Sequence, residues 1–271
     1  MVAARRAVHQ QIDRPLIFED PLAVRIVAPQ LLARMEREPR RFKTSRWARA
    51  LRAALVVRSR YAEDELRAAV LQGVRQYVLL GAGLDTFAYR NPFPELRVFE
   101  VDHPDTQAAK RRRLRDAGIA IPDTTVFVPI DFATTALDDG LRGSGFDRGQ
   151  PAVFAWLGVV PYLDREAIVR TLRVIASLPR GTVVVFDYGV APATLSWLGR
   201  FAVWRLRRKL EAIGEPIKSS FTSPEIIALL KEAGFAAVED LNDTELNRRY
   251  LSNRPDGLRV GEAMHIIKGS V

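Results

Sequence analysis

Apolar residues divide the chain into a helical first part and an alternating second part. Residues 1–75 are rich in Ala, Arg and Leu, and residues 58–71 (RSRYAEDELRAAVL) have the clearest helical pattern, which ends at Gly73. Short β-rich apolar runs then occur at residues 76–80, 96–101, 125–129, 152–157 and 182–187. Helical stretches such as 105–117 and 164–177 separate most of them. This alternation predicts a parallel sheet with helices on both faces.

The C-terminal part completes this pattern. Ser223 and Pro224 predict a helix start, with Ser223 as the N-cap and Pro224 as the first helical residue, and Gly234 ends that helix. Two more β-rich runs, 236–241 and 263–268, raise the expected number of strands to seven. We therefore expect an α/β fold built on one seven-stranded, doubly wound sheet.

A glycine pair follows the first apolar run, in YVLLGAGLDTFAYR (residues 77–90). Gly81 and Gly83 lie where open parallel sheets bind ligands, and glycine allows a close backbone approach and a positive φ. The same pair also fits a tight turn without a ligand. A dinucleotide site would have a third glycine where this chain has Thr86. S-adenosylmethionine (SAM) has no phosphate and does not require that glycine, so the spacing favours SAM over NAD.

Acidic residues end the next two runs. Glu100 and Asp102 in RVFEVDHP could accept hydrogen bonds from ribose hydroxyls, or one of them could cap the following helix. Asp131, followed by Phe132, could accept from an adenine amino group, or cap a turn. Because the ends of parallel strands share one edge of the sheet, three acids at the ends of two consecutive strands favour an adenosine-containing ligand.

Composition narrows the classes of site and partner. The chain has no Cys, which excludes disulfides, thiolate metal sites and a Cys nucleophile, and its three His are too far apart for a local metal motif. It has neither a signal-peptide pattern nor an apolar run of membrane-spanning length, so we expect a cytoplasmic protein. The net charge of +9 includes Arg clusters at 111–113 and 205–209. We interpret these as solvated helix faces rather than a nucleic-acid site, since aromatic residues interleave with them only near 197–204.

Several motifs occur together: an Arg-Ser helix start at Arg58, then LLGAGLDT-x-AYR, EVDHP, P-x-DF, WLGV-x-x-YL and VVFDY. With them the chain resembles the leucine carboxyl methyltransferase family of class I SAM-dependent methyltransferases, from about Arg58 to the last strand. It is most similar to bacterial members linked to O-methylation of polyketides and other secondary metabolites. The resemblance implies a Rossmann-like, mostly parallel sheet with an antiparallel last strand, SAM as cofactor, S-adenosylhomocysteine as product, and no metal. It also implies one methyltransferase domain made of an N-terminal helical extension (1–75), a SAM-binding core (76–190), a helical lid insertion (191–218) and a C-terminal helix with a strand pair (219–271).

Carried over by position, the family pattern implies a cofactor site at the strand ends. Arg58 would bind the SAM carboxylate through a charge-assisted contact, and Gly81 would lie beside the methionine part. Asp102 would bind the ribose, with Glu100 as the supporting acid. The remaining predicted cofactor-binding residues are Asp131 and Phe132 at the adenine, Ala82, Gly83 and Asp85 in the glycine turn, and Trp156 and Leu157 beneath the sulfonium.

Two positions depart from the family pattern. Phe87 stands where many relatives have Arg, so a polar role at this position is lost or moved. Leu157 stands where the protein-modifying branch has Glu, which argues against a protein C-terminal carboxylate as the methyl acceptor.

No side chain stands out as a general base. His103 adjoins the predicted ribose acid, His265 falls in the last strand and His9 lies near the N-terminus. Methyl transfer from a sulfonium depends mainly on positioning and needs a base only when the acceptor is protonated. An acceptor that is already ionised, a carboxylate or an acidic phenol, fits this pattern. Tyr162 and Tyr188 are candidates to orient it, and ordinary packing explains them equally well.

The insertion places Trp197, Phe201 and Trp204 on one helical side, followed by basic residues. We expect this stripe to form a lid over a hydrophobic aromatic acceptor. Core packing, or a basic amphipathic helix on a membrane surface, are the alternatives.

Together these patterns predict a SAM-dependent O-methyltransferase that acts on a carboxylate or phenolic hydroxyl of a small, aromatic or polyketide-type metabolite. An NAD(P)-dependent reductase, disfavoured by Thr86 and by the lack of a Tyr-x-x-x-Lys pair, is one alternative. A methyltransferase-like binding module without turnover is another. The expected partner is a small-molecule acceptor, and homo-oligomerisation is left open.

Overall fold

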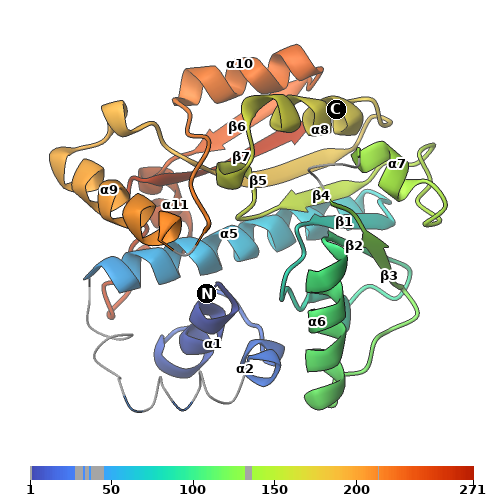
Figure 1. Cartoon of the computed structure of the whole chain (residues 1–271), viewed down its shortest axis with the longest axis horizontal. Helices are drawn as coiled ribbons and strands as arrows, with labels where there is room; N and C mark the ends of the chain where they lie inside the picture. The colour runs from blue at the N-terminus through green and yellow to red at the C-terminus, as the bar shows by residue number, and fades with distance from the viewer. Residues whose placement is uncertain (1, 28–32, 34–36, 38–45, 132–135, 213) are drawn as a thin grey trace.

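The computed structural model describes residues 2–27, 33, 37, 46–131, 136–212 and 214–271. Its centre is one seven-stranded sheet with the strand order β3-β2-β1-β4-β5-β7-β6 (Figure 1). The strands are β1 (Gln76–Leu80), β2 (Arg97–Asp102), β3 (Thr125–Pro129), β4 (Val153–Trp156), β5 (Val183–Gly189), β6 (Ala237–Leu241) and β7 (Met264–Ser270). Strand β7 runs antiparallel to β5 and β6, whereas the other neighbouring pairs are parallel. The predicted doubly wound, mostly parallel sheet with an antiparallel last strand is confirmed.

Helices cover both faces of this sheet. They are α1 (Val2–Ile12), α2 (Leu22–Ile26), α5 (Arg46–Leu71), α6 (Pro104–Asp116), α7 (Leu137–Leu141), α8 (Arg165–Ala176), α9 (Trp197–Glu211), α10 (Ser223–Ala233) and α11 (Asp243–Tyr250). Figure 1 shows α8 and α10 on one side of the sheet and α5 on the other. Helix α5 begins well before the predicted residue 58, because the preceding residues are also rich in the strong helix formers Ala, Leu and Arg.

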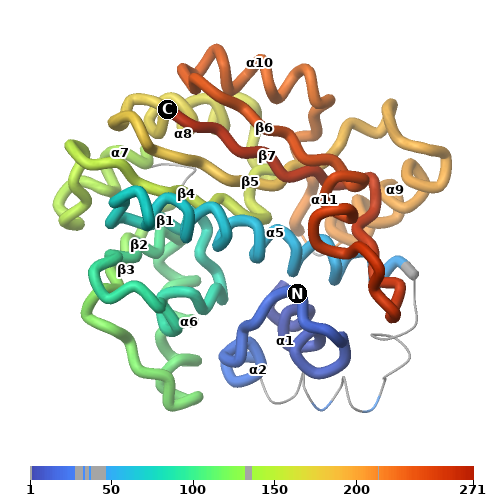
Figure 2. Tube along the Cα trace, turned by 180° about the vertical axis from the view of Figure 1, so that it is seen from behind, coloured from blue at the N-terminus to red at the C-terminus, as the bar shows by residue number. Residues whose placement is uncertain are grey.

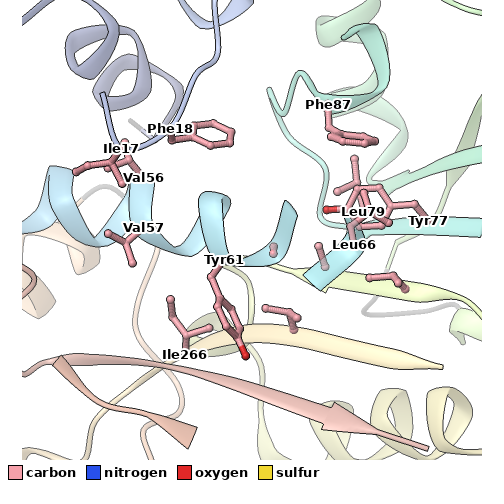
Figure 3. Packing of buried hydrophobic residues seen from close by; sticks show 14 of the residues in the cluster. Ile17, Phe18, Val56, Val57, Tyr61, Leu66, Tyr77, Leu79, Phe87 and Ile266 are labelled. Carbon is pink, nitrogen blue, oxygen red and sulfur yellow. The ribbon is translucent and has the colours of Figure 1, made fainter. Parts of the chain in front are cut away.

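Strand residues alternate between two buried faces. Tyr77 of β1 belongs to the core that contains α5 and α11, whereas Val78 belongs to the core that contains α8 and α10. Figure 3 shows the first of these cores, in which Tyr61 of α5 points toward Ile266 of β7. Because both faces are apolar, the strands occur in the sequence as nearly continuous apolar runs.

The start of α10 differs by one residue from the prediction. Thr222, not Ser223, is its N-cap: the Thr222 hydroxyl accepts from the Glu225 amide while the Glu225 carboxylate accepts from the Thr222 amide. This reciprocal pair satisfies two amides at once, which a cap at Ser223 would not do. Pro224 lies in the first turn, and Gly234 ends the helix with a φ of 114° as expected.

The N-terminal helices α1 and α2 lie beside α5 and α6 (Figures 1 and 2). Ala3 of α1 packs with Leu114 of α6 in a small apolar cluster. The buried carboxylate of Asp13 accepts from Arg52 of α5 at 2.7 and 2.9 Å and contacts His9 Nδ1 at 2.8 Å. These contacts hold α1 against α5 and α6.

Candidate functional site

Two neighbouring cavities lie at the carboxyl ends of β1, β4 and β5, where the order of the strands reverses. The smaller, of about 160 Å³, is lined by the glycine turn 81–85, by residues 157–159 and by α1. The larger, of about 670 Å³, is lined by parts of β5, α5 and α9 and by residues 214–218. Arg58 and Gly158 line both, so the two cavities meet there.

The two glycines of the turn have the conformations expected for them. Gly81 and Gly83 have φ angles of 69° and 47°. A Cβ at Gly81 would also collide with Val159 Cγ2, so no side chain fits there. The Gly83 amide donates to Asp102 Oδ2 at 2.5 Å and joins the turn after β1 to the end of β2. Glycine is therefore required by the turn and leaves its backbone open to the smaller cavity.

Arg58 reaches from α5 to the strand ends and is buried there. Its Nη1 donates to Asp187 Oδ2 at 2.8 Å, while Asp187 Oδ1 accepts from the Gly158 amide at 2.6 Å. The Nε of Arg58 is buried and has no hydrogen-bond partner within the described part of the chain. Because Nε is shielded from solvent, an anionic ligand in either cavity would contact this guanidinium through its terminal nitrogens. Asp187 was not among the predicted site residues, although VVFDY places an acid at the end of β5.

Glu100 is a buried structural acid. It is fully buried, pairs with Lys110 Nζ at 2.7 Å and accepts from the Tyr89 hydroxyl at 3.0 Å. Burial raises the pKa of the Glu100 carboxyl, and the Lys110 ammonium opposes that shift. The predicted role as a supporting acid is compatible with this position, but no ligand can reach the side chain while it is so enclosed.

Asp102 lies at the open end of the same strand. It is half-buried, and its two oxygens accept from the amides of Gly83 and His103. Neither β2 acid caps α6, because the His103 ring accepts from the Asp105 amide in that position. An ionised carboxylate has about four acceptor sites, so Asp102 retains capacity for ligand hydroxyls.

Asp85 ties α1 across the glycine turn. Arg6 Nη1 donates to Asp85 Oδ2 at 2.7 Å, and Arg6 Nη2 donates to the Leu84 carbonyl at 2.6 Å. Burial alone would raise the pKa of the Asp85 carboxyl, but the cations around it, Arg6 first, and the Phe87 amide lower it to about 2. The carboxylate is therefore ionised at neutral pH and paired within the protein.

Phe87, which stands where many relatives have Arg, packs edge-on against Tyr77, with 5.0 Å between the ring centroids. This position therefore contributes to packing.

The other predicted cofactor contacts are only partly brought together. Asp131 follows β3 and is half-buried, whereas Phe132 lies outside the described residues. Leu157 lines the smaller cavity. Trp156 is instead fully buried in the core of the opposite face, 5.8 Å from the Phe186 ring, and lines neither cavity. Of the predicted pair 156–157, therefore, only Leu157 lines the smaller cavity.

The two predicted acceptor-orienting tyrosines differ in what their hydroxyls contact. Tyr162 is half-buried and lines the larger cavity, and burial together with the nearby Glu215 carboxylate raises the pKa of its hydroxyl. It therefore stays protonated and able to donate. Tyr188 also borders this cavity, but its hydroxyl donates to Asp240 Oδ2 at 2.9 Å and contacts His265 Nδ1 at 3.1 Å. Neither partner lines the cavity, so the Tyr188 hydroxyl belongs to a separate polar cluster.

Helix α9 forms a wall of the larger cavity with the side opposite to the predicted one. The residues on this side are Val203, Leu206, Arg207 and Leu210. Trp197, Phe201 and Trp204 are 70%, 53% and 51% exposed and line neither cavity. The expected placement of the aromatic stripe over an acceptor is therefore wrong. The helix is apolar on two sides, and the sequence pattern did not distinguish the side with the smaller aliphatic residues as the inner one.

Within the described ranges, no group of three or more His, Asp or Glu side chains is arranged to hold a metal ion. No helix in that part of the chain is both long and apolar enough to cross a membrane. The buried His9 contacts Asp13 and the Ile17 amide, so it serves the packing of α1.

Comparison with known proteins supplies further findings. A family model described as leucine carboxyl methyltransferase matches residues 1–176. A Bacillus subtilis protein, YktD, named as a candidate S-adenosyl-L-methionine-dependent methyltransferase, is 34% identical over 98% of this chain and 94% of its own length. A solved structure of a candidate methyltransferase from Thermobifida fusca has a TM-score of 0.62 at 17% identity, covering 100% of this chain and 94% of the other. The solved structure of a DUF574-family protein from Streptomyces avermitilis has a TM-score of 0.59 at 18% identity, and the match covers 99% of this chain and 96% of the other. The two structures share the fold described above.

Proposed function

This chain belongs to the leucine carboxyl methyltransferase family and uses SAM as its cofactor, and on that premise we propose that it methylates an oxygen of a small molecule. The acceptor group is a carboxylate or an acidic phenol, carried on an aromatic or polyketide-type skeleton. The observation that carries this proposal is the cavity of about 670 Å³ that meets the glycine-turn cavity at Arg58 and Gly158. Its size falls within the roughly 300–1,000 Å³ of sites that enclose small molecules.

The lining of the larger cavity supports an apolar acceptor with a negative charge. Most of its side chains are apolar. Besides the paired Arg58 and Asp187, its walls carry three cations, Arg5, Arg207 and Lys218, and one acid, Glu215. Burial and repulsion from Arg52 lower the pKa of the Arg5 guanidinium, so a nearby anion would stabilise its charged form. No histidine is among the described residues that line the cavity, which favours an acceptor that needs no general base.

The residues around the smaller cavity fit SAM by charge and by backbone access. When bound, SAM supplies an electrophilic methyl group on its sulfonium. Arg58 lines both cavities and would offer its terminal nitrogens to the cofactor carboxylate. Asp102 lines neither cavity, but it accepts from the Gly83 amide of the glycine turn and has free acceptor sites for the ribose hydroxyls. Asp131 stays the candidate for the adenine. We place the methionine end at Arg58, because that residue lines both cavities.

The proposed catalysis is mainly positioning, which can contribute about 7–11 kcal/mol when the reacting atoms are held in line. The protonated Tyr162 hydroxyl would donate to the acceptor and fix its orientation. Residues of α1 line both cavities, and residues of α9 line the larger one.

Narrowing the larger cavity is expected to impair acceptor binding selectively. A panel of aromatic carboxylates and phenols, tested with methyl-labelled SAM, would first identify an accepted compound. Leu206→Trp should then raise the KM for that compound about tenfold or more, about 1.4 kcal/mol, because the larger side chain fills space that the acceptor needs. The affinity for S-adenosylhomocysteine, measured by calorimetry, should stay nearly unchanged.

The matched control is Trp204→Ala, on the outer side of the same helix. This substitution should alter neither the KM for the acceptor nor the affinity for S-adenosylhomocysteine. An unchanged KM in Leu206→Trp together with a raised KM in Trp204→Ala would mean that the outer stripe, not the cavity, binds the acceptor.

A further inference from the structure

The outer side of α9 carries the most concentrated exposed apolar surface among the described residues. Trp197, Leu198, Phe201 and Trp204 are each more than half exposed. Positions 197, 201 and 204 follow the helical repeat and share one side, and the rings of Phe201 and Trp204 stack with centroids 5.8 Å apart. Large apolar residues scattered singly on a surface need no explanation, but a contiguous group of this kind marks an interaction site.

This apolar stripe is bordered by positive charge. Arg200, Arg205, Arg208 and Lys209 are exposed, and Glu211 is the one acidic residue of the helix. Within the described part of the chain, none of these four cations forms an ion pair with an acidic side chain. The Arg208 guanidinium lies over the Trp204 ring at 5.3 Å, so charge and aromatic surface lie side by side. The occupant of this surface must therefore be both apolar and anionic.

A second copy of the chain does not meet that condition. A two-fold symmetric contact through α9 would place the same basic side against itself, and like charges directly opposed are unfavourable. A phospholipid bilayer with anionic headgroups does meet it. Trp and Phe are favoured at the boundary between headgroups and acyl chains, while Arg and Lys extend to the phosphates.

We propose that α9 docks this protein on the surface of an anionic phospholipid bilayer. Trp197, Phe201 and Trp204 enter the headgroup region, and Arg205, Arg208 and Lys209 contact the lipid phosphates. The helix lies in the plane of the interface and does not span the membrane. Its inner side, with Val203 and Leu206, lines the larger cavity, so a bilayer-dissolved apolar acceptor would reach that cavity around α9. This last consequence rests on the proposed function, whereas the docking itself does not.

Co-sedimentation with vesicles tests the docking. Wild-type protein should bind vesicles of phosphatidylcholine with 30% phosphatidylglycerol at least tenfold more tightly than pure phosphatidylcholine vesicles. The apolar variant Trp197→Ser/Phe201→Ser/Trp204→Ser and the charge variant Arg205→Gln/Arg208→Gln/Lys209→Gln should each lose at least tenfold of the binding to anionic vesicles. Because the altered side chains are exposed, unchanged thermal midpoints and unchanged affinity for S-adenosylhomocysteine should show that both variants are folded.

Two control variants separate this helix from general effects of charge and apolarity. Arg111→Gln/Arg112→Gln/Arg113→Gln removes the same charge from the exposed side of α6, and Leu71→Ser removes an exposed apolar residue from the end of α5. Both controls should bind like the wild type. If the α6 and α9 charge variants lost equal amounts of binding to anionic vesicles, the binding would depend on net charge alone, which would overturn the proposal.

Two further results would also overturn it. The first is a wild-type protein that does not bind anionic vesicles, which would leave the surface to a protein partner. The second is a wild-type dimer, measured by sedimentation velocity, that the apolar variant converts to a monomer, which would assign the stripe to a second copy. Neither result depends on methyl transfer, so failure of the docking and failure of the proposed function are distinguishable.

Discussion

Replacing Arg58 by Ala is expected to lower the affinity for S-adenosylhomocysteine by roughly 30- to 5,000-fold, about 2–5 kcal/mol. The guanidinium is buried where the two cavities meet, and removing it would leave both Asp187 and the cofactor carboxylate without a compensating charge. Arg58→Lys should recover only part of the affinity, because one ammonium cannot contact Asp187 and a second carboxylate with the fixed fork of a guanidinium. Calorimetric titration measures each constant.

Adenosine provides the internal control for this prediction, since it lacks the carboxylate. Its weaker binding should hardly respond to either substitution at Arg58. Arg60→Ala, on the same helix but exposed, should leave both ligands unaffected. If Arg58→Ala weakens adenosine as much as S-adenosylhomocysteine, or weakens neither, Arg58 does not hold the carboxylate.

The two acids of β2 are expected to respond to substitution in different ways. Glu100→Ala would leave the Lys110 ammonium buried without its partner, so the free energy of unfolding should fall by about 3–5 kcal/mol. Asp102→Ala should change stability much less but lower the affinity for S-adenosylhomocysteine tenfold or more, because each hydrogen bond to a charged group contributes about 1.5–3 kcal/mol. Urea unfolding and calorimetry on the same samples measure the two effects.

A double variant checks the cause of the instability. Glu100→Gln/Lys110→Met removes both charges of the pair and should recover most of the stability that Glu100→Ala loses. A stable Glu100→Ala variant with strongly reduced S-adenosylhomocysteine affinity would contradict the assignment and make Glu100 the ribose-binding acid.

The fold could be predicted from the sequence because its signals are local. Each strand is a short apolar run, and the stretches between most of them have a helical period, so all seven strands were predicted in their observed places. The antiparallel direction of β7 was implied by the family resemblance alone, since a single apolar run carries no information about direction. The start of α10 was misplaced because Thr222 and Ser223 are both good caps, and only the reciprocal contact with Glu225 distinguishes them.

The candidate site could be predicted only in part, because its partners are far apart in the chain. The ends of the strands indicated Gly81, which lines the smaller cavity, and Asp102, which contacts the glycine turn. The pairing of Arg58 with Asp187 instead depends on where α5 crosses the sheet. The burial of the Trp156 side chain away from both cavities could not be predicted, because both faces of a central strand are apolar and alternation does not show which face meets the site. The orientation of α9 could not be predicted for a similar reason, because that helix is apolar on two sides.

The central claim is that this site binds SAM, and calorimetric titration of the wild-type protein tests it most directly. The titration uses SAM, S-adenosylhomocysteine, NADH and NADPH in separate experiments on one preparation. Saturable binding of SAM and S-adenosylhomocysteine, with no heat of binding from NADH or NADPH, is the predicted result. Saturable binding of NADH without any response to S-adenosylhomocysteine would contradict it.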